Sequence, residues 1–238
     1  MGESATWMTL LAWGPEGWGD ELLLGAWLTV QLALVSLAAG LFFGLLLTSA
    51  AVSAWPPLRW LANAYMIFMR GVPEFLVLLL VFFGSEQILN GLLQMLGHPG
   101  GVTVPKFAAA CMGLSMIFAA YACEVLRGAY QAVPSGQLEA ARAVGMSGWQ
   151  TLRRIRVPQM WRFAIPGLAN LWMVMLKDTS LAAVIALDEL LRVAKVAGET
   201  TRLPLLFFVV AGLIYLVLTA LSDFGRQRLE ARARRGFA

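Results

Sequence analysis

Long apolar runs separated by short polar segments dominate this chain. A helix of about 20 mostly apolar residues is long enough to cross the hydrocarbon core of a bilayer. Five stretches reach or approach that length, at residues 22–49, 74–89, 107–125, 164–187 and 205–222. The pattern therefore predicts an all-α polytopic membrane protein with five transmembrane helices.

A less apolar segment, LRWLANAYMIFMRGVP, directly precedes the second run. One straight helix through both would be longer than a bilayer requires. Pro73 has no backbone N–H, so the carbonyl of Met69 loses its helical donor at this point. We expect the helix to bend near Pro73, and broken helices are tolerated in membranes where they line a cavity.

Composition agrees with a membrane protein. Of the 238 residues, 59% are hydrophobic and only 13% are charged, and the mean hydropathy of +0.72 is too high for a soluble domain. Cys111 and Cys123 both lie in apolar runs and are interpreted as small core residues. His98 has no second ligand at a suitable spacing, so we expect no metal site and no cofactor.

The basic residues predict an orientation. Twelve Lys and Arg residues fall on one side of the five spans and four on the other, and the richer side is expected to be cytoplasmic. The start of the chain carries Glu3, Glu16 and Asp20 but no Lys or Arg. We therefore expect an outside N-terminus, a cytoplasmic C-terminus that includes Arg235, and one transmembrane domain over residues 1–238.

One segment is unlike its surroundings, namely EAARAVGMSGWQTLRRIRVPQ at residues 139–159. Ser135 is expected to cap a short helix that stops at Gly145 in the left-handed conformation. Ser147 then opens a second helix, with Gln150 at the capping-box position, and Pro158 is expected to end it. The pattern predicts two short helices joined by a glycine.

The two helices have different surfaces. Ala140 and Ala141 have small side chains, so a partner could approach this backbone closely, with Glu139 and Arg142 available at the rim. On the second helix we expect an apolar stripe made of Trp149, Leu152 and Ile155. Its basic residues are expected to stay in water or meet lipid head groups, and they are Arg153, Arg154 and Arg156. From the residues alone, a partner surface and an amphipathic loop resting on the membrane remain equally open.

The same segment resembles the EAA-x3-G-x9-I-x-L-P signature of ABC-transporter permease subunits. The matching residues are Glu139, Ala140, Ala141, Gly145, Ile155 and Pro158, and the one departure is Val157 in place of leucine. The resemblance implies that residues 134–160 form a cytoplasmic coupling segment. In that family the part corresponding to residues 137–146 is the coupling helix, which sits in a cleft of the cytoplasmic ATPase.

Three longer stretches, residues 68–84, 119–145 and 165–201, resemble polar-amino-acid importers, most closely the Q-type membrane subunit of histidine, lysine/arginine/ornithine and opine systems. This implies the type I importer, or MetI-like, permease fold. It also implies two cytoplasmic ABC ATPase subunits, a homologous second permease or a second copy of this chain, and a periplasmic amino-acid-binding protein. No nucleic-acid partner is expected.

Other classes of protein find little support. The chain has no GxxxxGK[ST] phosphate loop, so ATP is expected to bind the partner subunit. A stand-alone carrier or channel would need no ATPase, which the EAA segment argues against. A membrane-embedded enzyme would need clustered catalytic groups, and only scattered carboxylates are present. We therefore expect a non-catalytic subunit.

Ionisable residues at membrane depth are functional candidates, because placing charge there is costly. Glu74 follows Pro73 and opens an apolar run, and the basic-amino-acid branch of the resembled family also has an acidic residue after this proline. We hypothesise that Glu74 pairs with the cationic group of a basic amino acid near Pro73 and Arg70. The alternatives are that Glu74 and Arg70 only neutralise each other, or that the substrate is a neutral or acidic polar amino acid.

The fourth span offers further candidates. Lys177 and Asp178 are adjacent and so do not face each other on a helix; they either reach the substrate or hold an interrupted helix. Asn170 could bond the α-amino or α-carboxylate group of an amino acid. Glu124 and Arg127 are expected to bridge each other. The charged stretch at residues 188–199 is interpreted as a solvated face, with contact to a binding protein as the alternative.

Overall fold

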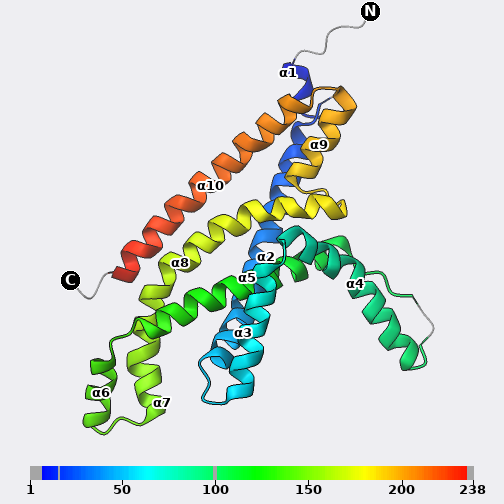
Figure 1. Ribbon diagram of the computed structural model, residues 1–238. Helices are drawn as coiled ribbons and strands as arrows, with labels where there is room; N and C mark the ends of the chain where they lie inside the picture. The colour runs from blue at the N-terminus through cyan, green and yellow to red at the C-terminus, as the bar shows by residue number, and fades with distance from the viewer. Residues whose placement is uncertain (1–6, 16, 99–100, 235–238) are drawn as a thin grey trace, which may run out of the picture. The chain divides into compact units, whose positions relative to one another are not determined.

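A computed structural model describes residues 7–15, 17–98 and 101–234. Glu3, Glu16 and Arg235, which contributed to the predicted orientation, lie outside these ranges. Figure 1 shows that the regular elements of the described chain are all helices, in this order: α1 (Trp7–Leu10), α2 (Gly19–Ala51), α3 (Pro56–Gly71), α4 (Glu74–Met95), α5 (Lys106–Gln131), α6 (Ser135–Ala143), α7 (Gly148–Thr151), η1 (Leu152–Arg156), α8 (Val157–Asp178), η2 (Thr179–Ile185), α9 (Leu190–Thr201) and α10 (Pro204–Arg234).

Within the described residues, five helical stretches are long and apolar enough to cross a membrane, which confirms the predicted number of spans. They are α2, α4, α5, the continuous run Gly148–Ile185, and residues 204–232 of α10. The helices extend beyond the apolar runs from which they were predicted. The 33 residues of α2 correspond to a rod of about 50 Å, so its ends reach past a hydrocarbon core of about 30 Å.

The predicted break at Pro73 is confirmed. Helix α3 ends at Gly71, and Val72 adopts an extended conformation with φ −93° and ψ 135°, because a residue before proline is disfavoured in the helical region. The chain restarts as α4, where the Pro73 carbonyl accepts hydrogen bonds from the backbone N–H groups of Leu76 and Val77 at 2.9 and 3.2 Å. The break sets Arg70 at the end of one helix and Glu74 at the start of the next.

The prediction that Pro158 ends a helix is wrong. The chain passes from α7 through the π-helical turn η1 into α8 without interruption, and the Val157 N–H bonds the Leu152 carbonyl in the wider π register. Pro158 is the second residue of α8 and directly follows this π turn, so its missing N–H falls where the α-helical hydrogen-bond register is already displaced. The predicted second short helix is thus the start of the fourth span.

The caps of the coupling segment are partly as predicted. Ser147 and Gln150 form the expected capping box, and Gly145 has the expected left-handed conformation with φ +81°. Ser135 is not a cap, since Pro134 occupies the N-cap position and Ser135 is the first residue of α6. Proline commonly sits at a helix start because it has no N–H to satisfy and a fixed φ.

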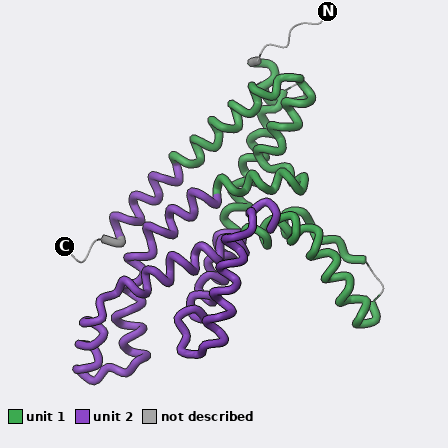
Figure 2. The backbone as a smooth tube through the Cα atoms, in the orientation of Figure 1, with its two compact units in different colours: residues 1–35, 78–114, 176–220 green, residues 36–77, 115–175, 221–238 purple. Residues whose placement is uncertain are grey.

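The chain divides into two compact units, coloured separately in Figure 2. Unit 1 contains residues 1–35, 78–114 and 176–220. Its core packs α9 against the first turns of α2 and of α10, through Leu10, Leu22, Ala26, Leu190, Ala194, Ala197, Phe207 and Ala211. Several of these are alanines, which allow the short helix α9 to lie close to its neighbours.

Unit 2 contains residues 36–77, 115–175 and 221–238. One core cluster of this unit joins α5, α6 and α8 through Leu126, Ala129, Val133, Leu138, Met160 and Ala164. The second half of α2 lies against α5 at two glycines: a Cβ added to Gly40 would lie 2.8 Å from Phe118 Cδ1, and one added to Gly44 would lie 2.9 Å from Ala122 Cβ. Small residues four apart let membrane helices approach closely. The interpretation of residues 1–238 as one domain stays a prediction.

Candidate functional site

Arg70 and Glu74 flank the broken helix, but they do not pair with each other. Arg70 Nη1 lies 3.3 Å from Glu124 Oε2 on α5. The two side chains are 45% and 39% exposed, so the rest of this chain does not enclose the ion pair. The alternative in which Arg70 and Glu74 neutralise each other is therefore wrong, because α5 presents Arg70 with a different carboxylate.

Glu74 is left with a neutral partner. Its Oε1 accepts a hydrogen bond of 3.2 Å from the Tyr121 hydroxyl. Among the described residues, no Lys or Arg nitrogen lies within 4.0 Å of this carboxylate. An ionised carboxylate has about four acceptor positions, so the partly buried Glu74 retains the capacity to bind a cation.

Tyr121 contacts both charged residues. Besides its bond to Glu74, its ring lies beneath Arg70, whose guanidinium carbon is 5.9 Å from the ring centroid. This distance is at the outer limit of a cation–π contact. The sequence analysis missed Tyr121, although its spacing from Glu124 places both on one face of a helix, and that spacing was the available signal.

Glu124 is shared by two arginines. The predicted bridge to Arg127 is confirmed, with Arg127 Nη2 at 3.0 and 2.8 Å from the two carboxylate oxygens. Arg70 binds the same carboxylate through Oε2. Two arginines and two glutamates thus lie together at the helix break within unit 2, and one carboxylate holds both guanidinium groups.

The remaining predicted substrate residues are separate from this cluster along the chain. Asn170 is exposed on α8 in unit 2, whereas Lys177 and Asp178 end α8 in unit 1. An interrupted helix is present here: α8 gives way to the 3-10 helix η2, whose Thr179 and Ser180 hydroxyls bond the Leu176 and Lys177 carbonyls at 2.7 Å. These local bonds support the structural alternative for Lys177 and Asp178, and a substrate contact of either residue stays a prediction.

Helix α6 of the predicted coupling segment has one buried and one exposed face. Glu139, Ala140 and Arg142 are exposed, as expected for a partner surface. Ala141 differs from the expectation, because it is only 5% exposed and lies on the same side as the buried Leu138. The exposed backbone of α6 is therefore flanked by Ala140 rather than by both alanines.

Gly145 turns the chain at the exposed corner after α6. Its N–H bonds the Arg142 carbonyl at 2.9 Å, and the Met146 N–H bonds the Ala141 carbonyl at 3.0 Å, which together form a Schellman motif. This motif requires the left-handed conformation that glycine adopts without strain. Two large apolar side chains project near the corner, Val144 at 78% and Trp149 at 67% exposure. Trp149 is thus not part of a buried stripe.

Polar contacts fix the corner to the helices that follow it. The Arg156 guanidinium lies 4.0 Å from the centre of the Tyr130 ring and donates to its hydroxyl. Gln159 bonds Gln137 of α6, and Ile155 packs on the unit 2 core cluster. Arg156 is therefore partly buried in the protein and not free for lipid head groups, whereas Arg153 and Arg154 are exposed as expected.

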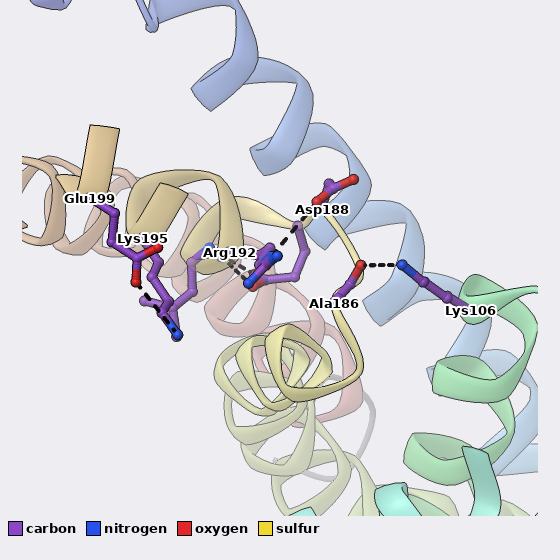
Figure 3. Close-up of polar contacts among 8 residues, drawn as sticks. Lys106, Ala186, Asp188, Arg192, Lys195 and Glu199 are labelled. Carbon is purple, nitrogen blue, oxygen red and sulfur yellow. Dashed lines mark hydrogen bonds and ion pairs between the residues drawn. The ribbon is translucent and has the colours of Figure 1, made fainter. Parts of the chain in front are cut away.

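Charged residues also gather around α9 in unit 1, as Figure 3 shows. Asp188 pairs with Arg192 at 4.0 Å, and Lys195 pairs with Glu199 at 3.8 Å. The Lys106 ammonium donates to the Ala186 carbonyl at 3.0 Å. These side chains form the solvated face that the sequence predicted, and the pairs bridge residues one helical turn apart.

Glu189 departs from that expectation because it is completely buried. It caps α9 by accepting the backbone N–H groups of Leu191 and Arg192 at 3.0 and 2.9 Å, and it accepts the hydroxyls of Tyr215 at 3.0 Å and Thr29 at 3.4 Å. The hydrogen bonds tie α9 to α2 and α10. Burial raises the pKa of the Glu189 carboxyl, and the four donors partly oppose that shift.

The described residues contain five membrane-length helices, which is the architecture of a polytopic helical membrane protein. Comparison with known proteins then specifies the family. Residues 40–235 match the family described as binding-protein-dependent transport system inner membrane component. The chain belongs to this family.

Relatives in that family are transport permeases. The chain is 43% identical over 230 residues to the nopaline transport system permease protein of Agrobacterium fabrum, with 96% of this chain and 98% of the relative covered. It is 38% identical over 226 residues to the arginine ABC transporter permease protein of Escherichia coli, with 90% and 95% covered. A solved amino acid ABC transporter with histidines is 29% identical at a TM-score of 0.79, covering 90% of this chain and 95% of that one. The predicted importer-permease fold is confirmed.

Proposed function

We propose that this chain forms the substrate pathway of an ATP-driven importer of basic amino acids or their derivatives. The names of its relatives support this class, because nopaline and arginine both carry a guanidinium group. The single observation that carries the proposal is the state of Glu74: its carboxylate is bound to the Tyr121 hydroxyl and has no cationic partner among the described residues. A cationic side chain fills that position with a favourable charge pair.

The helix break gives Glu74 its role. Glu74 is the first residue of α4, so the break places its carboxylate at the end of a helix rather than within one. Tyr121 orients the carboxylate through one oxygen, so the other oxygen can receive the substrate. Asn170, Lys177 and Asp178 are further candidates for contacts with the α-amino and α-carboxylate groups.

The corner at Gly145 is proposed as the contact with the ATPase. Exposed Val144 and Trp149 are apolar anchors of the kind that fill a pocket on a partner, and Glu139 and Arg142 lie at the polar rim. The proposed assembly contains two ATPase subunits, a second permease or a copy of this chain, and a periplasmic binding protein. Chemistry takes place in the ATPase, and this chain binds and releases the substrate in alternating outward and inward states.

Uptake by the reconstituted assembly tests the proposal. Glu74→Gln keeps the shape of the side chain and removes its charge, so we expect transport of arginine, lysine and histidine to fall while assembly is retained. Glu199→Gln is the matched control, since it removes an exposed carboxylate on α9. Unchanged affinity and selectivity in Glu74→Gln would rule out this role, and preferential uptake of a neutral amino acid would rule out the substrate class.

Orientation is proposed with the corner and the C-terminus in the cytoplasm of a bacterial inner membrane. A cysteine placed at Val144 is exposed, whereas the native Cys111 and Cys123 are buried. In intact cells a membrane-impermeant maleimide should leave Val144→Cys unlabelled, and it should label this residue after the inner membrane is opened. Labelling of intact spheroplasts would reverse the orientation.

A further inference from the structure

Arg70 and Glu74 both contact Tyr121, Arg70 over its ring and Glu74 at its hydroxyl. Arg70 lies over the ring with its guanidinium carbon 5.9 Å from the centroid, and the Glu74 carboxylate accepts the hydroxyl at 3.2 Å. The guanidinium and the carboxylate are therefore neighbours on one tyrosine side chain. Arg70 pairs instead with Glu124, at 3.3 Å.

The charges of the cluster indicate that Glu124 determines which carboxylate Arg70 binds. Two guanidinium groups, Arg70 and Arg127, share the Glu124 carboxylate, while Glu74 has none. If Glu124 were neutral, Glu74 would be the one carboxylate left among these four residues. Arg70 is the arginine already beside it, so Arg70 would be the first to pair with it.

We propose that Glu124 is a positioning residue that holds Arg70 away from Glu74 and thereby keeps Glu74 available for the cationic side chain of the substrate. The inference rests on the proposed function, in which Glu74 receives that cation. Arg70 is then an internal competitor, because its guanidinium group has the same chemistry as the side chain of arginine or the guanidinium of an opine.

The geometry allows such competition at low cost. The Arg70 and Glu124 side chains are 45% and 39% exposed, so the rest of this chain leaves them room to rearrange. Arginine has a long side chain with many rotamers. Arg127 orients Glu124 in turn, through contacts of 3.0 and 2.8 Å with its two carboxylate oxygens. In this orientation Glu124 also binds Arg70.

The test measures binding of radiolabelled arginine to the purified assembly, containing this chain, its permease partner and the ATPase, without the binding protein. Glu124→Gln should weaken binding about tenfold, a loss of about 1.4 kcal/mol. The double variant Glu124→Gln with Arg70→Gln should restore it to within about threefold of wild type. The matched control, Glu124→Gln with Arg127→Gln, should show no recovery, because Arg70 remains free to pair with Glu74.

Arg70→Gln alone keeps the proposal falsifiable if loss of Glu124 prevents assembly. Removing the competitor while Glu124 stays in place should strengthen arginine binding several-fold. Unchanged or weaker binding in Arg70→Gln, or no rescue in the double variant, would overturn the inference. Failure of the proposed function looks different: arginine would then not bind wild type, or Glu74→Gln would bind it as well as wild type does.

Discussion

The Tyr121 hydroxyl donates a hydrogen bond of 3.2 Å to Glu74 Oε1 and so connects the middle of α5 to the first residue of α4. Tyr121→Phe removes this bond and leaves the ring. A net hydrogen bond contributes about 1 kcal/mol, so we expect the affinity for basic substrates to fall about fivefold. The binding assay on the purified assembly measures this loss.

Tyr65→Phe is the control for that substitution. Its hydroxyl also bonds α5, at a distance of 2.9 Å, but the acceptor is the backbone carbonyl of Met116 rather than a carboxylate. We expect a loss of stability without a change in substrate affinity. Equal effects of the two substitutions on affinity would mean that Tyr121 only supports the fold.

Gly40 tests the close approach of α2 and α5. In a helix, replacing glycine by alanine ordinarily stabilises by about 1 kcal/mol. At Gly40 the new Cβ would lie 2.8 Å from Phe118 Cδ1 and 2.9 Å from the Ser115 carbonyl oxygen, so we expect Gly40→Ala to lower the melting temperature. Gly128→Ala on α5 meets nothing within 4 Å and should raise it slightly or leave it unchanged. A stabilised Gly40→Ala protein would contradict the packing.

Glu189 predicts a dependence of stability on pH. Burial raises the pKa of this carboxyl above its ordinary value of 4.5, so the folded protein binds this proton more strongly than the unfolded chain does. Its contribution to stability is therefore greatest below the ordinary pKa and declines as pH rises toward the raised value. Melting temperatures of wild type and Glu189→Gln, compared between pH 4 and 7, should show this decline only in wild type. Parallel pH profiles would contradict it.

Gly145 tests the corner of the coupling segment. Alanine there would have to adopt φ +81°, at a cost of about 1 kcal/mol or more, and would strain the Schellman motif. We expect Gly145→Ala to lower substrate-stimulated ATP hydrolysis by the assembly several-fold. Gly136→Ala is the control, because Gly136 lies in α6 without a positive φ and with open space around it. Full stimulation in Gly145→Ala would show that the corner tolerates rearrangement.

The sequence predicted features that depend on local chemistry. The five spans follow from hydropathy, the break follows from the missing N–H of Pro73, and the Ser147 cap and Gly145 turn follow from side-chain and backbone preferences within four residues. Pro158 was predicted to end a helix because a proline ordinarily breaks the α-helical hydrogen-bond pattern, whereas here it directly follows the π turn η1 inside a continuous helix.

Features that depend on packing between distant segments could not be predicted. Glu189 was interpreted as solvated because its neighbours are charged, and its burial requires Thr29 and Tyr215 from other helices. Arg70 likewise pairs with Glu124 rather than with Glu74, and Glu124 lies on α5, some 50 residues away in the chain. Sequence spacing identifies partners on one helix, whereas it cannot rank partners on another.

The shared carboxylate of Glu124 has a consequence for release of the substrate. At neutral pH the charges of the two arginines and two glutamates at the helix break balance. Under the proposed function, a basic side chain that pairs with Glu74 leaves these four side chains and the substrate with one net positive charge, so the two arginines weaken its binding and shorten the time it stays. A short residence time suits a transport pathway, because the substrate must leave the site in every cycle as well as enter it.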